Sequence, residues 1–144
     1  MKITNERVLL IVLKCDFSEL GGYGISYILL EQPQLSKYVK DWDKLSGKNW
    51  VVLLEKHSEQ FADICKWEKL NGSDWCNLLR TLPQFAQYCN DWSTLKGEDW
   101  VKLLISQPEF AKHCDWKKLN SACWRKLLAE RPDQDFRRFK PKKR

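Results

Sequence analysis

The chain has 144 residues, of which 43% are hydrophobic and 31% charged, a size and composition typical of one soluble globular domain that excludes a fibrous or disordered protein. The formal net charge is +6, and six of the last eight residues are basic, which leaves 19 basic and 19 acidic residues in positions 1–136. The body of the chain is therefore neutral, unlike a nucleic-acid-binding domain with a basic folded face.

Near the amino terminus, the apolar run Val8–Leu13 follows two basic residues, Lys2 and Arg7. Its six residues are too few for a signal peptide, and no run approaches the ~18 apolar residues that cross a bilayer. We expect residues 5–14 to form a buried helix, the second helix of a partial leading unit. We also expect a cytoplasmic protein without membrane contact, whose six cysteines are free thiols.

From residue 17 onward the chain repeats one unit of about 25 residues. Each unit begins with an aromatic residue, which is followed by a leucine after three residues and by a second large apolar residue after eight. The first aromatic column is Phe17, Trp42, Trp67, Trp92 and Trp116, with spacings of 25, 25, 25 and 24. The second column is Ile25, Trp50, Trp75, Trp100 and Trp124. Five copies therefore cover most of the chain.

The apolar spacing inside each unit is helical. In the fourth unit, Trp100, Leu103 and Leu104 lie at i, i+3 and i+4, which is one face of an α-helix. Asp99 supplies an acceptor where a helix begins, and Gly97 marks a break between elements. The same positions recur in the other units, so each unit is predicted to contain this helix.

A second short helix is predicted after the first. Proline at its first position loses no hydrogen bond and ends the preceding helix. Ser58 takes this position in the second unit. In the fourth unit Phe110 and Cys114 follow at i and i+4. The prolines are Pro33, Pro83, Pro108 and Pro132.

Because helices this short are unstable alone, the units must stack to bury their Trp and Leu side chains. The predicted fold is all-α, a short α-solenoid of about five two-helix repeats with atypical capping units. Phe17 and Ile25 replace tryptophan in the first unit, and Ser121 replaces glycine in the last. We predict one domain over residues 1–136 and a basic, disordered tail over residues 137–144.

The unit is clearest as DWSTLKGEDWVKLLISQPEFAKHC at residues 91–114. It resembles the tryptophan-rich tandem helical repeats, of the form DWxxLxGxDWxxLLxxxPxFAxxC, of uncharacterised bacterial proteins. The resemblance covers about residues 15–130. It implies a repeat scaffold and carries no assigned activity. The first and last units and Ser58 depart from the pattern.

The tryptophans and cysteines are interpreted as packing residues. All eight tryptophans occupy the two columns, a regularity that favours burial over an open stacking platform. Cysteine alternates with Val39 in another column, so that position requires a small apolar group and not a thiolate. No C-x-x-C pair is present, which argues against a zinc site. The cysteines of this column are Cys15, Cys65, Cys89 and Cys114.

Neither histidine belongs to a catalytic motif. We expect His113 to be half-buried beside Cys114, where it cannot act as its base, and His57 to be exposed. The acidic residues are scattered, and no nucleophile, metal or phosphate-loop motif is found. We therefore expect no enzymatic activity, no catalytic residue, no cofactor and no metal.

The leading functional hypothesis is a non-enzymatic protein-binding repeat module, for example a small regulator or inhibitor of a larger complex. The alternative is nucleic-acid binding through the last repeat and the basic tail. A structural, self-assembling repeat is the third reading, and the oligomeric state is left open. The candidate contacts for an acidic partner or nucleic acid are Lys117, Lys118, Arg125, Lys126, Arg137, Arg138, Lys140, Lys142, Lys143 and Arg144.

Overall fold

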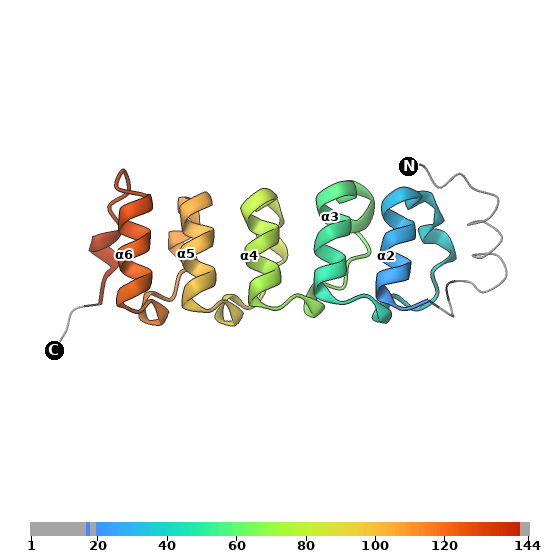
Figure 1. The fold of residues 1–144 in the computed structure, drawn as a ribbon, viewed down its shortest axis with the longest axis horizontal. Helices are drawn as coiled ribbons and strands as arrows, with labels where there is room; N and C mark the ends of the chain where they lie inside the picture. Colours follow the sequence, from blue (N-terminus) through green and yellow to red (C-terminus); the bar gives the residue numbers. More distant parts are fainter. Residues whose placement is uncertain (1–16, 18–19, 142–144) are drawn as a thin grey trace. The chain divides into compact units, whose positions relative to one another are not determined.

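In the computed structural model, which describes Phe17 and residues 20–141, all regular secondary structure is helical. The α-helix of each unit begins at the glycine column, or at Ser121 in the last unit. The fold is therefore the all-α tandem repeat of solenoid type that the sequence predicts. The α-helices are α2 (Gly22–Glu31), α3 (Gly47–Ala62), α4 (Gly72–Thr81), α5 (Gly97–Ser106) and α6 (Ser121–Glu130) (Figure 1).

Short 3-10 helices connect the α-helices. Three of them follow an α-helix and start at proline: Pro33–Tyr38, Pro83–Tyr88 and Pro108–His113. Single 3-10 turns carry the first tryptophan of each unit: Trp42–Lys44, Trp67–Lys69, Trp92–Thr94 and Trp116–Lys118. A last 3-10 helix spans Phe136–Phe139. The predicted second helix is thus a tight 3-10 segment, a geometry confined to short runs.

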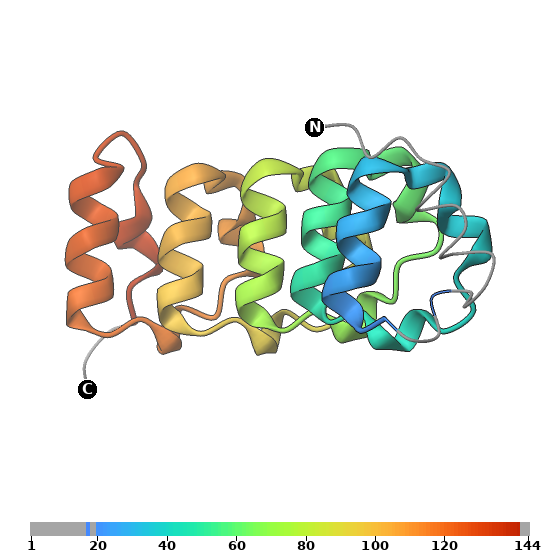
Figure 2. The ribbon, with the colours of Figure 1, turned by 45° about the vertical axis from the view of Figure 1, so that its right-hand side comes forward.

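The chain divides into two compact units, Met1–Leu70 and Asn71–Arg144. In the first compact unit α2 packs against α3. In the second compact unit α4 packs against α5, and α5 packs against α6. Figure 2 shows α4, α5 and α6 in one row, with their 3-10 segments behind them. The predicted helix over residues 5–14 and Cys15 lie outside the described residues.

The helices α3 and α4 begin with reciprocal capping of their first turn. The Ser46 hydroxyl accepts from the Asn49 amide, and the Asn49 side chain accepts from the Ser46 amide at 2.9 Å. Asn71 and Asp74 form the same pair in α4. The acceptor expected before the second tryptophan is therefore confirmed, because it satisfies a backbone donor that the helix leaves unpaired.

The glycine at the start of α2, α4 and α5 is required by the next repeat. A Cβ on Gly22 would lie 2.4 Å from the Lys44 carbonyl oxygen. A Cβ on Gly97 would lie equally close, at 2.4 Å, to the Lys118 carbonyl oxygen. The sequence predicts only a break between elements here. The structure adds that the following turn packs directly onto the helix start, where no side chain fits.

In α3 the break between the two helices occurs without proline. The helix continues to Ala62, but the backbone of His57 within it is non-helical, with φ −134° and ψ 57°. Gln32, the residue before Pro33, has nearly the same backbone, with φ −133° and ψ 69°. Stacking therefore imposes this bend on the chain even where Ser58 replaces proline.

The two tryptophan columns differ in burial. Trp50, Trp75, Trp100 and Trp124 of the second column are at most 5% exposed and form the core with the paired leucines. The tryptophans of the first column are only half-buried: Trp42, Trp67, Trp92 and Trp116. The packing role predicted for the tryptophans is fully met in the second column and partly in the first.

The predicted basic tail begins at residue 137, and the structure places Phe136–Phe139, across that boundary, in a 3-10 helix. Phe136 is buried, and its ring centroid lies 5.8 Å from that of Trp116. Phe110 contacts Trp92 in the same way at 5.7 Å. The last repeat thus also has a second helix, and its phenylalanine comes two residues later along the chain than in the preceding repeat. Lys142, Lys143 and Arg144 lie outside the described residues.

Within residues 20–141, none of the helices has the length and apolar character needed to cross a lipid bilayer.

Candidate interaction surfaces

Two of the half-buried tryptophans, Trp92 and Trp116, have both ring faces covered. Trp116 stacks on Trp124, with centroids 5.3 Å apart, and on Phe139 at 4.8 Å with an interplanar angle of 1°. Trp92 lies in the same way between Trp100 at 5.7 Å and His113 at 4.4 Å. A nucleobase stacks only on an open aromatic face. These two indoles therefore offer only their edges to a ligand.

The described cysteines are free thiols, as the sequence predicts. Burial raises the pKa of Cys65 and Cys114 to about 12 and the pKa of Cys76 and Cys89 to about 11. A protonated thiol is a poor nucleophile and a poor metal ligand. Among the described residues no group of three or more metal-binding side chains comes together.

The histidines lie differently from what the sequence predicts. His57 is half-buried, not exposed, and its Nε2 lies 2.9 Å from the Leu30 carbonyl oxygen of the preceding helix. His113 is exposed, not half-buried, because it covers the outer face of Trp92. Desolvation of the imidazole ring, with a smaller effect of the Lys112 charge, lowers the pKa of His113. Both side chains pack between elements and neither faces a nucleophile.

Lys118, one of the candidate contacts, has a structural role. Its Nζ donates to the Leu95 carbonyl oxygen at 2.8 Å and also to that of Ser93. Lys44 and Lys69, two residues after their own tryptophans, likewise donate to Leu20 and Asp43 of the preceding repeat, at 3.1 and 2.8 Å. The ammonium groups of this column therefore join one repeat to the next.

The other described candidate cations are exposed. They lie in α6, in the turn before it, in the last 3-10 helix and directly after that helix. The Arg138 guanidinium lies over the Phe139 ring at 4.6 Å, and the Lys140 ammonium lies 6.0 Å from the Trp124 ring. The structure therefore gathers Lys117, Arg125, Lys126, Arg137, Arg138 and Lys140 around the last repeat.

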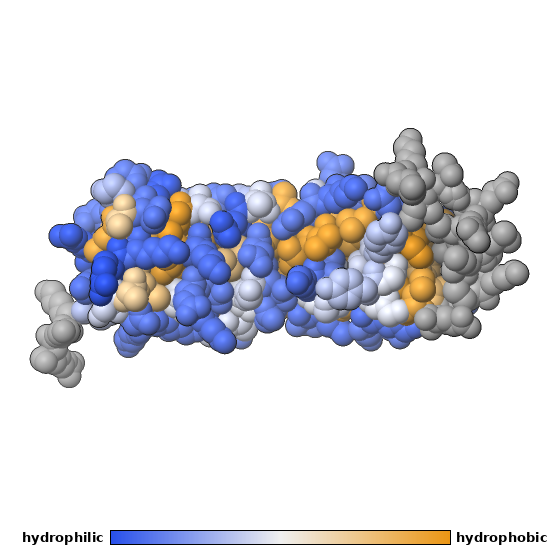
Figure 3. All heavy atoms as spheres, in the orientation of Figure 1, coloured by the Kyte–Doolittle hydropathy of each residue, from blue (hydrophilic) through white to orange (hydrophobic). Residues whose placement is uncertain are grey.

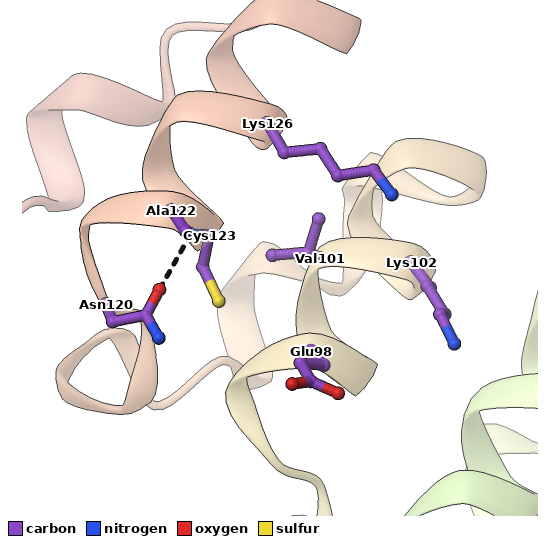
Figure 4. Close-up of a pocket in the computed structure, with 7 residues that line it drawn as sticks. All are labelled: Glu98, Val101, Lys102, Asn120, Ala122, Cys123 and Lys126. Atoms are coloured by element: carbon purple, nitrogen blue, oxygen red, sulfur yellow. Dashed lines mark hydrogen bonds between the residues drawn. The ribbon is translucent and has the colours of Figure 1, made fainter.

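A groove of about 270 Å³ lies between α5 and α6. Figure 4 shows the Cys123 sulfur pointing into it, beside Val101 and Glu98 of α5. Lys102 and Lys126 extend along its rim. The lining residues combine one thiol with charges of both signs and include no histidine, so the groove lacks a nucleophile–base pair.

An exposed apolar patch, which we call the α2–α3 patch, lies in the first compact unit. Tyr23 is 78% exposed, Tyr27 61% and Val52 39%, although these side chains are large and hydrophobic. Tyr27 and Val52 occupy the same column, two residues after the second large apolar residue of their units. Figure 3 shows apolar surface over α3. The column comparison could have revealed this patch, because Asn77, Lys102 and Lys126 are its polar counterparts.

Comparison of the chain with protein-family models, with curated proteins and with solved structures finds no match.

Proposed function

We propose that this protein is a non-enzymatic protein-binding repeat module, and that the α2–α3 patch is its main contact surface. The exposed aromatic rings of Tyr23 and Tyr27 carry the proposal. Tyrosine is enriched at protein interfaces because it buries a large rigid surface and still offers a hydroxyl. A soluble protein rarely keeps such side chains together in water without a partner.

The position of the patch within the repeat supports the proposal. In the column of Tyr27 and Val52, the three repeats of the second compact unit carry Asn77, Lys102 and Lys126. The fold accepts polar residues there, so packing does not require an aromatic or aliphatic one. A partner that contacts this surface gives a reason for the apolar residues, and a regulator or inhibitor of a larger complex is the form that we favour.

The other functional readings have less support. Nucleic-acid binding through the last repeat would depend mainly on phosphate contacts, because Trp116 has no open ring face there for a base. We propose the cytoplasm as the compartment, which suits free thiols such as Cys65. Membership of the tryptophan-rich bacterial repeat proteins also stays a proposal.

The test is affinity capture from the native cytosol with two matched double variants. The double variant Tyr27→Lys/Val52→Lys introduces two lysines into the patch. Lysine is the residue type that this column already has at Lys102 and Lys126. Ser73→Lys/Asn77→Lys adds the same charge to the exposed side of α4. We expect the wild type and the α4 variant to retain one stoichiometric partner and the patch variant to lose it.

Circular dichroism and thermal unfolding confirm that both variants keep the fold. Equal capture by the patch variant and the wild type would contradict the role of the patch. If no stoichiometric partner is captured by the wild type, the protein-binding function itself is wrong.

A further inference from the structure

The last repeat presents a second surface, which we call the α6 end groove. It has a volume of about 650 Å³, and its floor is apolar. The start of α6, the turn before it and the segment after Phe139 form its walls. Its lining residues include Trp116, Lys117, Leu119, Arg125, Leu128 and Lys140.

At α4 and α5 the position that corresponds to this groove is occupied by the next repeat. The Thr94 carbonyl oxygen faces Gly72, at 2.1 Å from the position of a Cβ there. The thiol of Cys76, one residue after the second tryptophan, donates to the Asp99 carbonyl oxygen at 3.3 Å. The start of α4 therefore lies directly against backbone carbonyl oxygens of the next repeat.

At the start of α6, two positions that contact the next repeat in α4 and α5 carry different residues. Ser121 stands where Gly72 and Gly97 allow the close approach. The exposed Arg125 stands where Cys76 and Val101 are buried. Another repeat in the same register would meet the Ser121 side chain and bury the Arg125 charge without a partner. A second copy of this chain is therefore not the ligand that this groove fits.

The charge of the groove points to an acidic ligand. Lys117, Arg125 and Lys140 line it, and no acidic residue does. The Lys117 position holds Asp43 and Glu68 in earlier repeats, so its charge is reversed at the last one. A nucleobase gains little here, because Trp116 is covered on both faces.

We propose that the α6 end groove binds an acidic peptide segment of a partner protein. An apolar side chain of the peptide lies over Leu119 and Leu128, and flanking carboxylates pair with the three cations. The α2–α3 patch belongs to the first compact unit and the α6 end groove to the second, so the proposal extends the proposed function to a second contact.

The test is fluorescence anisotropy with a short labelled peptide that is rich in Asp and Glu and has a central Leu-Leu pair. Lys117→Asp/Arg125→Val gives the groove residues that earlier repeats carry. Lys102→Asp/Lys112→Gln removes the same amount of positive charge from exposed sites of the same compact unit. We expect the groove variant to weaken binding by about tenfold and the control by less than about threefold.

Two further arms decide the chemistry. Replacing the Leu-Leu pair with Ser-Ser should weaken binding several-fold, and Tyr27→Lys/Val52→Lys should leave it unchanged even if that variant loses the partner in affinity capture. The proposal is overturned if the peptide does not bind at low ionic strength or if both charge variants weaken it equally. It is also overturned if a single-stranded oligonucleotide binds more tightly and loses that binding in the groove variant.

Discussion

Gly72 and Thr94 approach each other so closely that a Cβ on Gly72 would lie 2.1 Å from the Thr94 carbonyl oxygen and 2.9 Å from the Leu95 Cα. Both atoms belong to backbone, which cannot move aside as a flexible side chain can. The spacing between α4 and the following turn is thus set by a glycine. Ser121 has the equivalent position in α6, where its side chain is exposed.

Gly72→Ala should lower the free energy of unfolding by about 2 kcal/mol, because the added methyl group forces the two repeats apart. At an ordinary helical position the same change would be stabilising by roughly 0.5–1 kcal/mol. Ser121→Ala is the matched control and should change stability by less than about 0.5 kcal/mol. Urea unfolding measures both, and a stabilised Gly72→Ala protein would show that the two backbone segments leave room for a methyl group.

Neighbouring lysines should differ in their contribution to stability. Lys118→Met removes the hydrogen bond to the Leu95 carbonyl oxygen, and we expect it to cost about 1 kcal/mol. Lys117→Met removes an exposed ammonium group and should cost less than about 0.5 kcal/mol. Chemical unfolding of the two variants provides the comparison. Equal losses would mean that Lys118 does not join the repeats.

The repeat, its helices and the buried second tryptophan column could be predicted because each has a periodic signal in the sequence. The positions of Trp100 and Leu104 lie at helical spacing and are apolar in every repeat. The position of Asp99 lies where a helix start needs an acceptor, and a polar residue occupies it in several repeats. These features depend on contacts within a few residues along the chain. The same local rules could not distinguish an α-helix from the 3-10 helix at Pro108–His113, whose short length fits both.

Features that depend on contacts between repeats could not be predicted. The Lys118 side chain looks like a free cation in the sequence, and only its approach to the Leu95 carbonyl oxygen shows its role. Phe139 looks like part of a polar tail because a two-residue shift moves it out of register, although it stacks on Trp116. Of the candidate surfaces, the cations of the last repeat were predicted, and the α2–α3 patch was not.

Ser58→Pro should stabilise the protein by roughly 0.5–1 kcal/mol. His57 already has nearly the backbone that Gln32 has before Pro33, and proline reduces the entropy of the unfolded chain. Lys56→Pro, two residues earlier and inside the regular part of α3, should cost about 3 kcal/mol or more. Thermal unfolding separates the two outcomes. A loss of stability in Ser58→Pro would show that the Ser58 amide has an essential hydrogen bond.

The buried Cys65 thiol should make the protein less stable at alkaline pH. Desolvation, with a smaller effect of Glu68, raises its pKa from 9.0 to about 12. Above about pH 9 the unfolded chain releases the thiol proton while the folded protein keeps it, so stability falls as pH rises until the folded pKa of about 12 is passed. Val39 occupies the same column, so Cys65→Val should fold normally and lose less stability between neutral pH and about pH 10. Urea midpoints at the two pH values measure this difference.

The control is Val39→Ala, a packing change with no titrating group, which should lower stability by the same amount at both pH values. An equal pH dependence in Cys65→Val and the wild type would rule out the thiol as the source of the alkaline loss.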